Sequence, residues 1–312
     1  MVTVNRFFEK DSVNIVFGSN NKYAKYLGVA LNSLIENTSQ DRLYDIIILE
    51  TDIQDDIKQV ILTLIENKNN ISIRFINTKE IYESLDTEKL FCHIYFTKEM
   101  YLRLFIPQLL KDYYKAVYLD CDTLIQSDVA ELYDTELENN YLAAVKDFNT
   151  IVNFKHNDKV KYYYEQVLKY GNMDNYFNSG MLVMNLTELR NVNLIEKTLE
   201  LLETHKELLY PDQDLLNIIC KNNVKIIHSG WNFVFSVNSA LIYDNYFIPL
   251  AIEWSKGLES QKILHYLSNL KPWLYPELGY SDIWWLAAKR TPFYQDLLKE
   301  YFDAHPEHLE NK

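Results

Sequence analysis

Short runs rich in β-branched and aromatic residues alternate with longer amphipathic runs along the first 120 residues. Runs of period two predict strands, and runs of period 3.6 predict helices. The predicted strands are Val13–Phe17, Tyr44–Leu49, Ile71–Ile76 and Ala116–Leu119, and the predicted helices are Tyr23–Ile35 and Asp55–Asn67. Such alternation builds a mostly parallel sheet with helices on both faces, whose ligands bind at the carboxyl ends of the strands. We therefore expect an α/β fold with its site at that edge.

The alternation loosens after residue 130. Further predicted strands are Tyr141–Val145 and Phe177–Leu186, and further predicted helices are Asp158–Lys169, Leu194–Lys206, Asp212–Cys220 and Ser281–Phe302. The last of these carries Trp284 and Trp285, which we expect either to pack against the main body or to form an interfacial or acceptor-docking element. Seven Gly and seven Pro provide no linker that would mark a domain boundary.

The composition of the chain disfavours several classes of ligand, metal site and cellular location. The net charge of -13 repels nucleic acid and anionic lipid, so an anionic ligand needs a metal or a few placed basic residues. Three cysteines stand far apart without a C-x-x-C pair, which disfavours a disulfide scaffold or zinc cluster and suits a reducing cytoplasm. No apolar stretch resembles a signal peptide or approaches the ~20 residues that span a bilayer. We expect a cytoplasmic protein with at most peripheral contact at the inner face of the membrane.

The predicted strand Ala116–Leu119 ends on the motif Asp120-Cys121-Asp122. If the chain stays extended through the motif, both carboxylates point to one side and can face one cation, while Cys121 faces the interior. Carboxylate oxygens suit magnesium or manganese, which commonly complete their shells with phosphate oxygens. An exposed turn after a strand is the plainer interpretation of the same residues.

A second alternative is the haloacid-dehalogenase type of phosphatase, which opens with a strand and Asp-x-Asp. Its fifth position is Thr or Val, whereas this chain has Leu124 there and Thr123 one place early. The later Lys and Gly-Asp-x-x-x-Asp pair of those phosphatases have no clear counterpart. The absence of G-x-G-x-x-G after the first strand also disfavours a dehydrogenase.

Six motifs follow one another along the chain. They are Val13–Phe17 with Tyr23, Tyr101–Leu104, Tyr118–Asp122, Phe177–Gly180, Asp212–Asp214, and His265-Tyr266 with Lys271–Trp273. In this order they resemble glycosyltransferase family 8, a retaining family that includes glycogenin and bacterial α-galactosyltransferases. The resemblance implies a single Rossmann-like nucleotide-sugar-binding domain of GT-A type, with a mixed, mostly parallel sheet, over residues 1–275. Its nucleotide-binding half would reach about residue 130 and its acceptor half residue 275, leaving 276–312 as a helical extension.

The resemblance also implies a metal site formed by Asp120, Asp122 and His265. His265 follows an apolar pair and so is expected at a strand end, and its nitrogen favours manganese over magnesium. Lys271 is close enough along the chain to neutralise the same diphosphate as UDP departs. Taken alone, His265 is read first as a hydrogen-bonded structural histidine, and the alternative for Lys271 is a solvated surface lysine.

The remaining donor contacts come from the same resemblance. The turn Gly18-Ser19-Asn20 is expected to hold uracil and ribose, with Tyr23 near the base. Family members often carry an acidic residue in place of Asn20, and many carry Gly in place of Ser268. The full expected cofactor-binding set is Gly18, Ser19, Asn20, Tyr23, Arg103, Asp120, Cys121, Asp122, Asn178, Ser179, His265, Ser268 and Lys271.

Sugar hydroxyls are expected to meet Arg103, Asp147, Asn178, Asp212 and Gln213. Asp212 also reads as a helix cap after Pro211, and Asn178 as a turn residue. The expected catalytic residues are Asp147, Asp212 and Gln213. Because an amide is a poor nucleophile, Gln213 favours front-side attack by the acceptor, and Asp147 or Asp212 as a covalent nucleophile is the alternative.

Together these features predict a retaining hexosyltransferase that uses a UDP-sugar and manganese, with magnesium as the second choice of metal. UDP-galactose is favoured as the donor, followed by UDP-glucose, and the acceptor is a glycan, a lipid-linked glycan or a glycoprotein. The alternative within the same fold is a non-catalytic UDP-sugar-binding protein.

Overall fold

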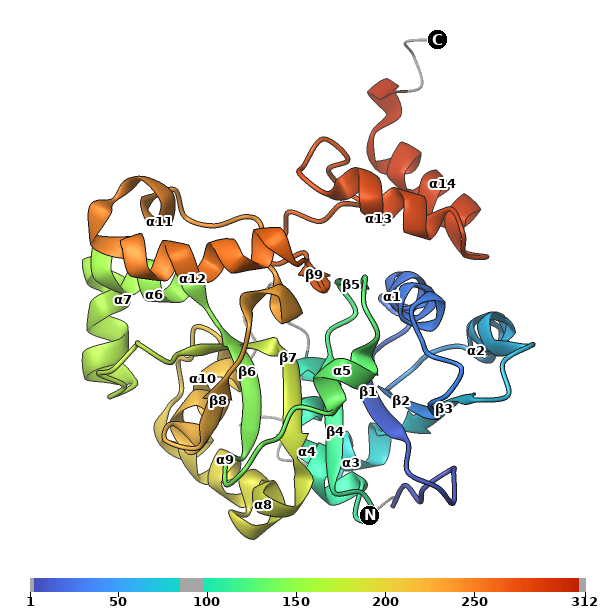
Figure 1. Ribbon diagram of the computed structural model, residues 1–312, viewed down its shortest axis with the longest axis horizontal. Helices are drawn as coiled ribbons and strands as arrows, with labels where there is room; N and C mark the ends of the chain where they lie inside the picture. Colours follow the sequence, from blue (N-terminus) through green and yellow to red (C-terminus); the bar gives the residue numbers. More distant parts are fainter. Residues whose placement is uncertain (1–2, 85–97, 309–312) are drawn as a thin grey trace.

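A computed structural model describes residues 3–84 and 98–308. Within these residues seven strands form one sheet in the order β3-β2-β1-β4-β7-β6-β8 (Figure 1). The strands are β1 (Val13–Ser19), β2 (Tyr44–Glu50), β3 (Ile71–Asn77), β4 (Lys115–Leu119), β6 (Leu142–Lys146), β7 (Phe177–Asn185) and β8 (Val224–Ile226). Neighbours run parallel except where β7 lies antiparallel to β4 and to β6. This mixed, mostly parallel sheet confirms the predicted α/β fold class.

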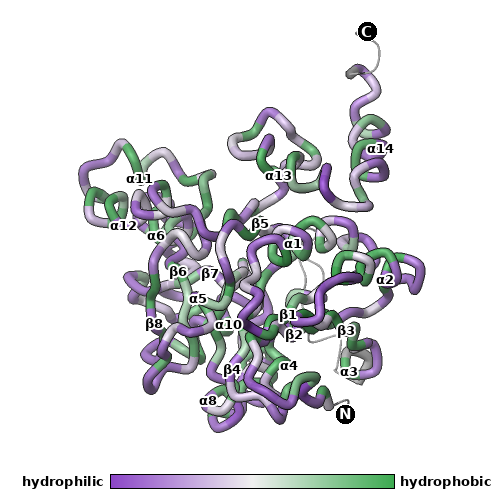
Figure 2. The backbone as a smooth tube through the Cα atoms, turned by 45° about the vertical axis from the view of Figure 1, so that its right-hand side comes forward, coloured by the Kyte–Doolittle hydropathy of each residue, from purple (hydrophilic) through white to green (hydrophobic). Residues whose placement is uncertain are grey.

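Alternate residues of each strand enter two apolar cores, one on each face of the sheet. Ile15 and Phe17 of β1 join the core that contains α1 (Ala24–Glu36). Val16 joins the opposite core, with α4 (Leu102–Leu109). All of β2 is buried, as expected of a strand covered on both faces. Figure 2 accordingly shows hydrophobic segments around β1, β2 and α4 and largely hydrophilic outer loops.

The other helices surround this sheet, except for the last two of the chain, which lie beyond it (Figure 1). They are α2 (Asp55–Leu62), α3 (Lys79–Ser84), α5 (Val129–Tyr133), α6 (Phe148–His156), α7 (Asp158–Tyr162), α8 (Leu186–Asn191), α9 (Leu194–Thr204), α10 (Pro211–Cys220), α11 (Ala240–Tyr243), α12 (Ile248–Glu259), α13 (Ser281–Ala288) and α14 (Tyr294–Ala304). Among the described residues, every helix is too short or too polar to cross a membrane.

The predicted strands agree with the structure to within two residues at each end, but three predicted helices are too long. The predicted helix Asp55–Asn67 is α2 followed by a 3-10 turn, Thr63–Ile65. The predicted helix Asp158–Lys169 is α7 followed by a π-helical turn, Tyr163–Val167. The single predicted C-terminal helix is instead α13 and α14, because Pro292 between them lacks the N–H group that a continuous helix requires.

The two C-terminal helices project from the main body (Figure 1). They are nevertheless anchored by Trp284 of α13, whose side chain is fully buried. Its ring centroid lies 5.1 Å from that of Trp273 and 6.4 Å from that of Tyr26 on α1. Tyr26 and Trp273 are themselves stacked at 4.0 Å. Of the two roles expected for this aromatic stretch, Trp284 therefore serves packing.

Candidate active site

The acidic motif lies at the carboxyl end of β4, where the chain turns into a short strand, β5 (Thr123–Ile125). The Thr123 hydroxyl donates a hydrogen bond of 2.7 Å to the Asp120 carbonyl and closes this turn. Of the two conformations considered for the motif, the structure therefore has the turn and not the extended chain. The turn still directs Cys121 inward, because its Sγ lies 3.1 Å from the carbonyl oxygen of Gly18 at the end of β1.

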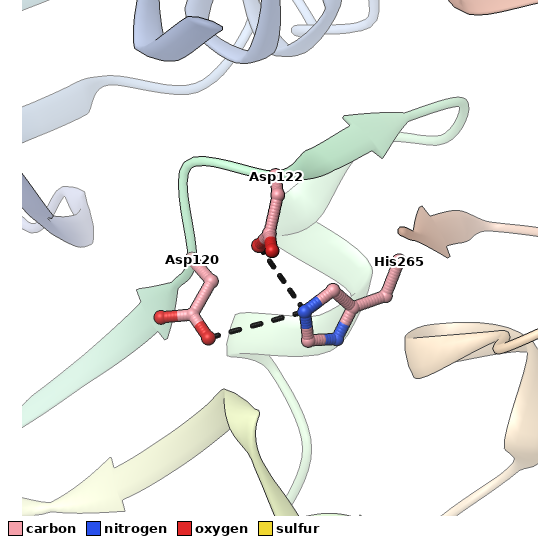
Figure 3. A group of neighbouring side chains, drawn as sticks. All are labelled: Asp120, Asp122 and His265. Atoms are coloured by element: carbon pink, nitrogen blue, oxygen red, sulfur yellow. Dashed lines mark ion pairs between the residues drawn. The ribbon is translucent and has the colours of Figure 1, made fainter. Parts of the chain in front are cut away.

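A two-stranded sheet brings the late histidine to this motif. In it β5 pairs with β9 (Ile263–His265), and Thr123 lies directly opposite His265. His265 Nε2 is 3.2 Å from Asp122 Oδ1 and 3.9 Å from Asp120 Oδ2 (Figure 3). One ligand atom from each of the three residues lies within 4.8 Å of the others. Residues 143 positions apart in the sequence (265 minus 122) thus converge at one point.

A hydrogen bond at Nδ1, on the side of the ring away from the aspartates, fixes the orientation of the His265 imidazole. His265 Nδ1 is 2.8 Å from Asn232 Oδ1, and the Asn232 amide nitrogen donates to Asn178 Oδ1 at 2.9 Å. Because an amide oxygen only accepts, this bond assigns the proton to Nδ1 and leaves a lone pair on Nε2. The ring is 1% exposed, and among the described residues Nε2 has no hydrogen-bond partner. A buried lone pair facing two carboxylates fits a divalent cation.

Basic side chains hold the remaining carboxylate oxygens. Lys271 Nζ donates to Asp122 Oδ2 and, at 2.6 Å, to the carbonyl oxygen of Tyr266. Burial raises the pKa of Asp122, but the Lys271 ammonium outweighs burial and holds that pKa below its usual range. Asp122 is therefore ionised at neutral pH.

The other aspartate of the motif, Asp120, is held through one of its two carboxylate oxygens. Its Oδ1 accepts from Arg103 Nη2 at 2.8 Å and from the Tyr118 hydroxyl at 2.7 Å, which leaves Oδ2 toward His265. Arg103 Nε also lies 3.0 Å from Asp212 Oδ2. The buried guanidinium, which we expected at the sugar, thus links two carboxylates of the site.

Gly180 makes room for the metal-site side chains. A Cβ atom at this position would lie 2.1 Å from His265 Cε1 and 2.8 Å from Asp120 Oδ2. Its backbone N–H donates to Asn178 Oδ1 at 3.0 Å, and its carbonyl accepts from the Asp120 N–H at 2.9 Å. A residue without a side chain is therefore required where β7 passes the acidic motif.

Next to the metal-site residues lies a buried polar network centred on Gln213. Its Oε1 accepts from Asn178 Nδ2 and from the Ser179 N–H, both at 3.1 Å, and its Nε2 donates to Asp147 Oδ2 at 3.0 Å. Asp212 Oδ2 accepts from the Ser179 hydroxyl at 3.0 Å. Burial raises the pKa of Asp212, and Arg103 opposes that shift.

The helix cap that the sequence suggested is absent, and a cap that it did not suggest is present. Asp212 gives α10 no side-chain cap. Asp147, in contrast, caps α6 by accepting from the Thr150 N–H at 2.9 Å.

The nucleotide-side residues lie around the end of β1. Gly18 and Ser19 end that strand, and Asn20 Oδ1 accepts from the Tyr23 N–H at 3.1 Å. Burial, followed by the charges of Asp122, Cys121 and Asp120, raises the pKa of Tyr23 to about 12, so this ring borders the acidic motif. Ser268 lies in a loop with φ of 66°, and its hydroxyl oxygen accepts from the Leu270 N–H at 3.3 Å.

A family model described as glycosyl transferase family 8 matches residues 14–277. The chain belongs to glycosyltransferase family 8. This assignment confirms the resemblance drawn from the six motifs.

Several relatives are similar to this family 8 chain. A Haemophilus influenzae protein is 30% identical over 228 residues, which cover 71% of this chain and 63% of that protein. General stress protein A of Bacillus subtilis is 27% identical over 273 residues, 85% of this chain and 88% of that protein. Lipopolysaccharide 1,2-glucosyltransferase of Escherichia coli K12 is 27% identical over 296 residues, 92% of this chain and 80% of that enzyme.

Solved structures show the same fold. The WbbM bifunctional glycosyltransferase matches with a TM-score of 0.84 and 27% identity, over 95% of this chain and 53% of that chain. This chain thus spans about half of WbbM. The galactosyltransferase LgtC, solved with donor and acceptor sugar analogues, matches with a TM-score of 0.73 and 25% identity, over 90% of this chain and 96% of that chain.

Three residues of this family 8 site were not singled out as site residues from the sequence. Gly180 ends the motif Phe177–Gly180, and its only signal was that a glycine within a strand often marks a close approach of neighbouring atoms. Tyr118 likewise stands in a quoted motif but reads as a core residue of β4. Asn232 had no signal, because its importance comes from its bond to His265 across the fold.

Proposed function

We propose that this protein is a retaining hexosyltransferase that moves a hexose from a UDP-sugar to a glycan, lipid-linked glycan or glycoprotein acceptor. The observation that carries the proposal is the buried Nε2 of His265, which has no hydrogen-bond partner within the described part of the chain and faces Asp120 and Asp122 beside Lys271. Membership of family 8 supports the class of reaction. UDP-galactose is the favoured donor and UDP-glucose the next, in keeping with similarity to a galactosyltransferase and a glucosyltransferase.

Asp120, Asp122 and His265 would hold the divalent cation. When bound, the cation supplies positive charge to the diphosphate oxygens of the donor. A ligand set of two carboxylates and one imidazole favours manganese, with magnesium second. Arg103 and Asn232 orient these ligands from behind.

Lys271 carries the charge that the departing diphosphate needs. Its ammonium is buried and is held by Asp122 and the Tyr266 carbonyl, so it is fixed beside the carboxylate oxygens of the metal site. As the bond between the anomeric carbon and the phosphate oxygen breaks, negative charge grows on UDP. A fixed ammonium in a buried setting stabilises that charge.

The residues around the sugar support front-side attack. Asp147 is engaged by Gln213 and by the α6 backbone, and Asp212 by Arg103 and Ser179. Because each carboxylate is already paired, neither is a free nucleophile. We infer that the acceptor oxygen bonds to the anomeric carbon on the face that UDP leaves, and that its proton passes to the leaving phosphate oxygen.

The test is release of UDP from a panel of UDP-hexoses by purified protein with manganese, with and without an acceptor sugar. We expect release with UDP-galactose or UDP-glucose, and loss of release in Asp120→Ala. Tight binding of a UDP-hexose without any release would favour the non-catalytic alternative. Phosphate release from sugar phosphates that persists in His265→Ala would favour the phosphatase.

A further inference from the structure

A buried carboxylate beside the sugar network has no part in the mechanism above. Asp214 follows Gln213 on α10 and is 0% exposed. Its Oδ1 accepts from the Tyr176 hydroxyl at 2.5 Å, and its Oδ2 accepts from the Tyr163 hydroxyl at 2.6 Å. Tyr164, next along the π-helical turn, lies 3.4 Å from Oδ1. Three tyrosines thus enclose one carboxylate away from the metal ligands.

The hydrogen bonds around Tyr176 fix the donor and acceptor roles of its hydroxyl. A phenol has one proton, and Tyr176 donates it to Asp214, so its oxygen is left to accept. It accepts from Gln213 Nε2 at 3.2 Å. Gln213 Nε2 gives its other proton to Asp147, while Gln213 Oε1 accepts from Asn178 and Ser179. The amide oxygen of Gln213 therefore accepts two hydrogen bonds, and its amide nitrogen donates two.

We propose that Asp214 is a positioning residue that, through Tyr176, holds the Gln213 side chain in one orientation at the donor sugar. The proposal rests on the hexosyltransferase function proposed above. With Asp214 ionised, Tyr176 can only present an oxygen to Gln213. With Asn at position 214, the new amide N–H can occupy the Tyr176 oxygen and turn the phenol proton toward Gln213 Nε2. Two donors then face each other, and the amide must shift or reverse.

The protonation of Asp214 is the natural readout of this coupling. Burial raises its pKa to about 6, while hydrogen bonds from Tyr163 and Tyr176 oppose that shift. The ionisable groups that face it are Tyr163, Tyr164, Tyr176, Tyr210 and Asp212. Since the ionised carboxylate is the form that fixes Tyr176, kcat should rise as pH increases through about 6.

The experiment is a double-mutant cycle on manganese-dependent UDP release at pH 8. Asp214→Asn and Tyr176→Phe are each made in the wild-type chain and in Gln213→Ala. In the wild-type chain each should lower kcat about tenfold, with the donor KM changed less than about twofold. In Gln213→Ala neither should lower kcat further. Tyr176→Phe should also abolish the rise of kcat near pH 6.

Tyr163→Phe is the matched control, because it removes a different tyrosine bond to Asp214 without touching Gln213. It should lower the melting temperature as much as Tyr176→Phe while leaving kcat unchanged at pH 8. Equal losses of kcat in both backgrounds, or in both tyrosine variants, would overturn the positioning role. If Asp214→Asn does not fold, the Tyr176→Phe arm decides the matter alone. A wild-type chain that releases no UDP would instead sink the proposed function.

Discussion

Gly180 leaves no room for a side chain beside His265 and Asp120. We expect Gly180→Ala to displace one of those ligands, because the new Cβ would lie 2.1 Å from the imidazole. Manganese affinity should fall by about 10- to 100-fold, the effect typical of disturbed ligand geometry. The measurement is calorimetric titration of manganese in the presence of UDP. Gly171→Ala is the control, since a Cβ there meets nothing within 4 Å, and a similar loss in that variant would refute the explanation.

Asn232 acts on the cation only through the histidine ring. Asn232→Ala removes the acceptor of the His265 Nδ1 proton, so the ring can rotate or change tautomer. We expect manganese affinity to fall by about tenfold or more while the melting temperature changes little. Asn238→Ala, which removes another partly buried amide bonded to Asn153, should leave manganese affinity unchanged. An unaltered affinity in Asn232→Ala would contradict the tautomer assigned here.

Ser268 occupies the left-handed backbone region that favours glycine. Its φ of 66° costs a residue with a side chain about 1 kcal/mol. Ser268→Gly should therefore raise the melting temperature by about 2 °C and retain activity. Ser268→Val should lower it, because a β-branched residue tolerates this region worst. Both values are read by differential scanning calorimetry, and a stabilising valine would show that the loop adopts another conformation.

At the scale of elements, the C-terminal helix supports the loop that carries Lys271. Trp284 of α13 packs on Trp273, two residues beyond Lys271, and Trp273 stacks on Tyr26. Trp284→Ala should cost about 3 to 5 kcal/mol of local packing and loosen that loop. The dissociation constant of UDP-galactose should rise accordingly in fluorescence titrations. Leu286→Ala on the same helix removes an exposed side chain and should leave it unchanged.

The strands that sequence patterns predicted are those with a strong period. Residues of β1, β2 and β3 alternate between two cores along strands of seven residues each, which is long enough for the pattern to show. Strands β5 and β9 have three residues each, too few for a period to show. Their pairing is what positions His265, so the metal site was predicted from the ordered motifs and not from local pattern.

At the scale of the whole molecule, the reversal of β7 assembles the sugar side of the site. A parallel β7 would place Asn178, Ser179 and Gly180 at the far edge of the sheet from Asp120. Because β7 runs antiparallel to β4, its first residues lie beside the last residues of β4. Apolar patterns report burial and carry no direction, so they did not identify β7 as the reversed strand. The family resemblance implied a mixed sheet without saying which strand is antiparallel.

The small sheet of β5 and β9 also decides when the site can exist. During synthesis Asp122 leaves the ribosome 143 residues before His265 (265 minus 122), shortly after Asp120, and Lys271 follows six residues after the histidine (271 minus 265). Until β9 pairs with β5, a growing chain holds two carboxylates without the nitrogen ligand or the buried ammonium. Cation binding should therefore report completion of the fold, and a chain stopped before residue 263 should bind manganese no better than two surface carboxylates do.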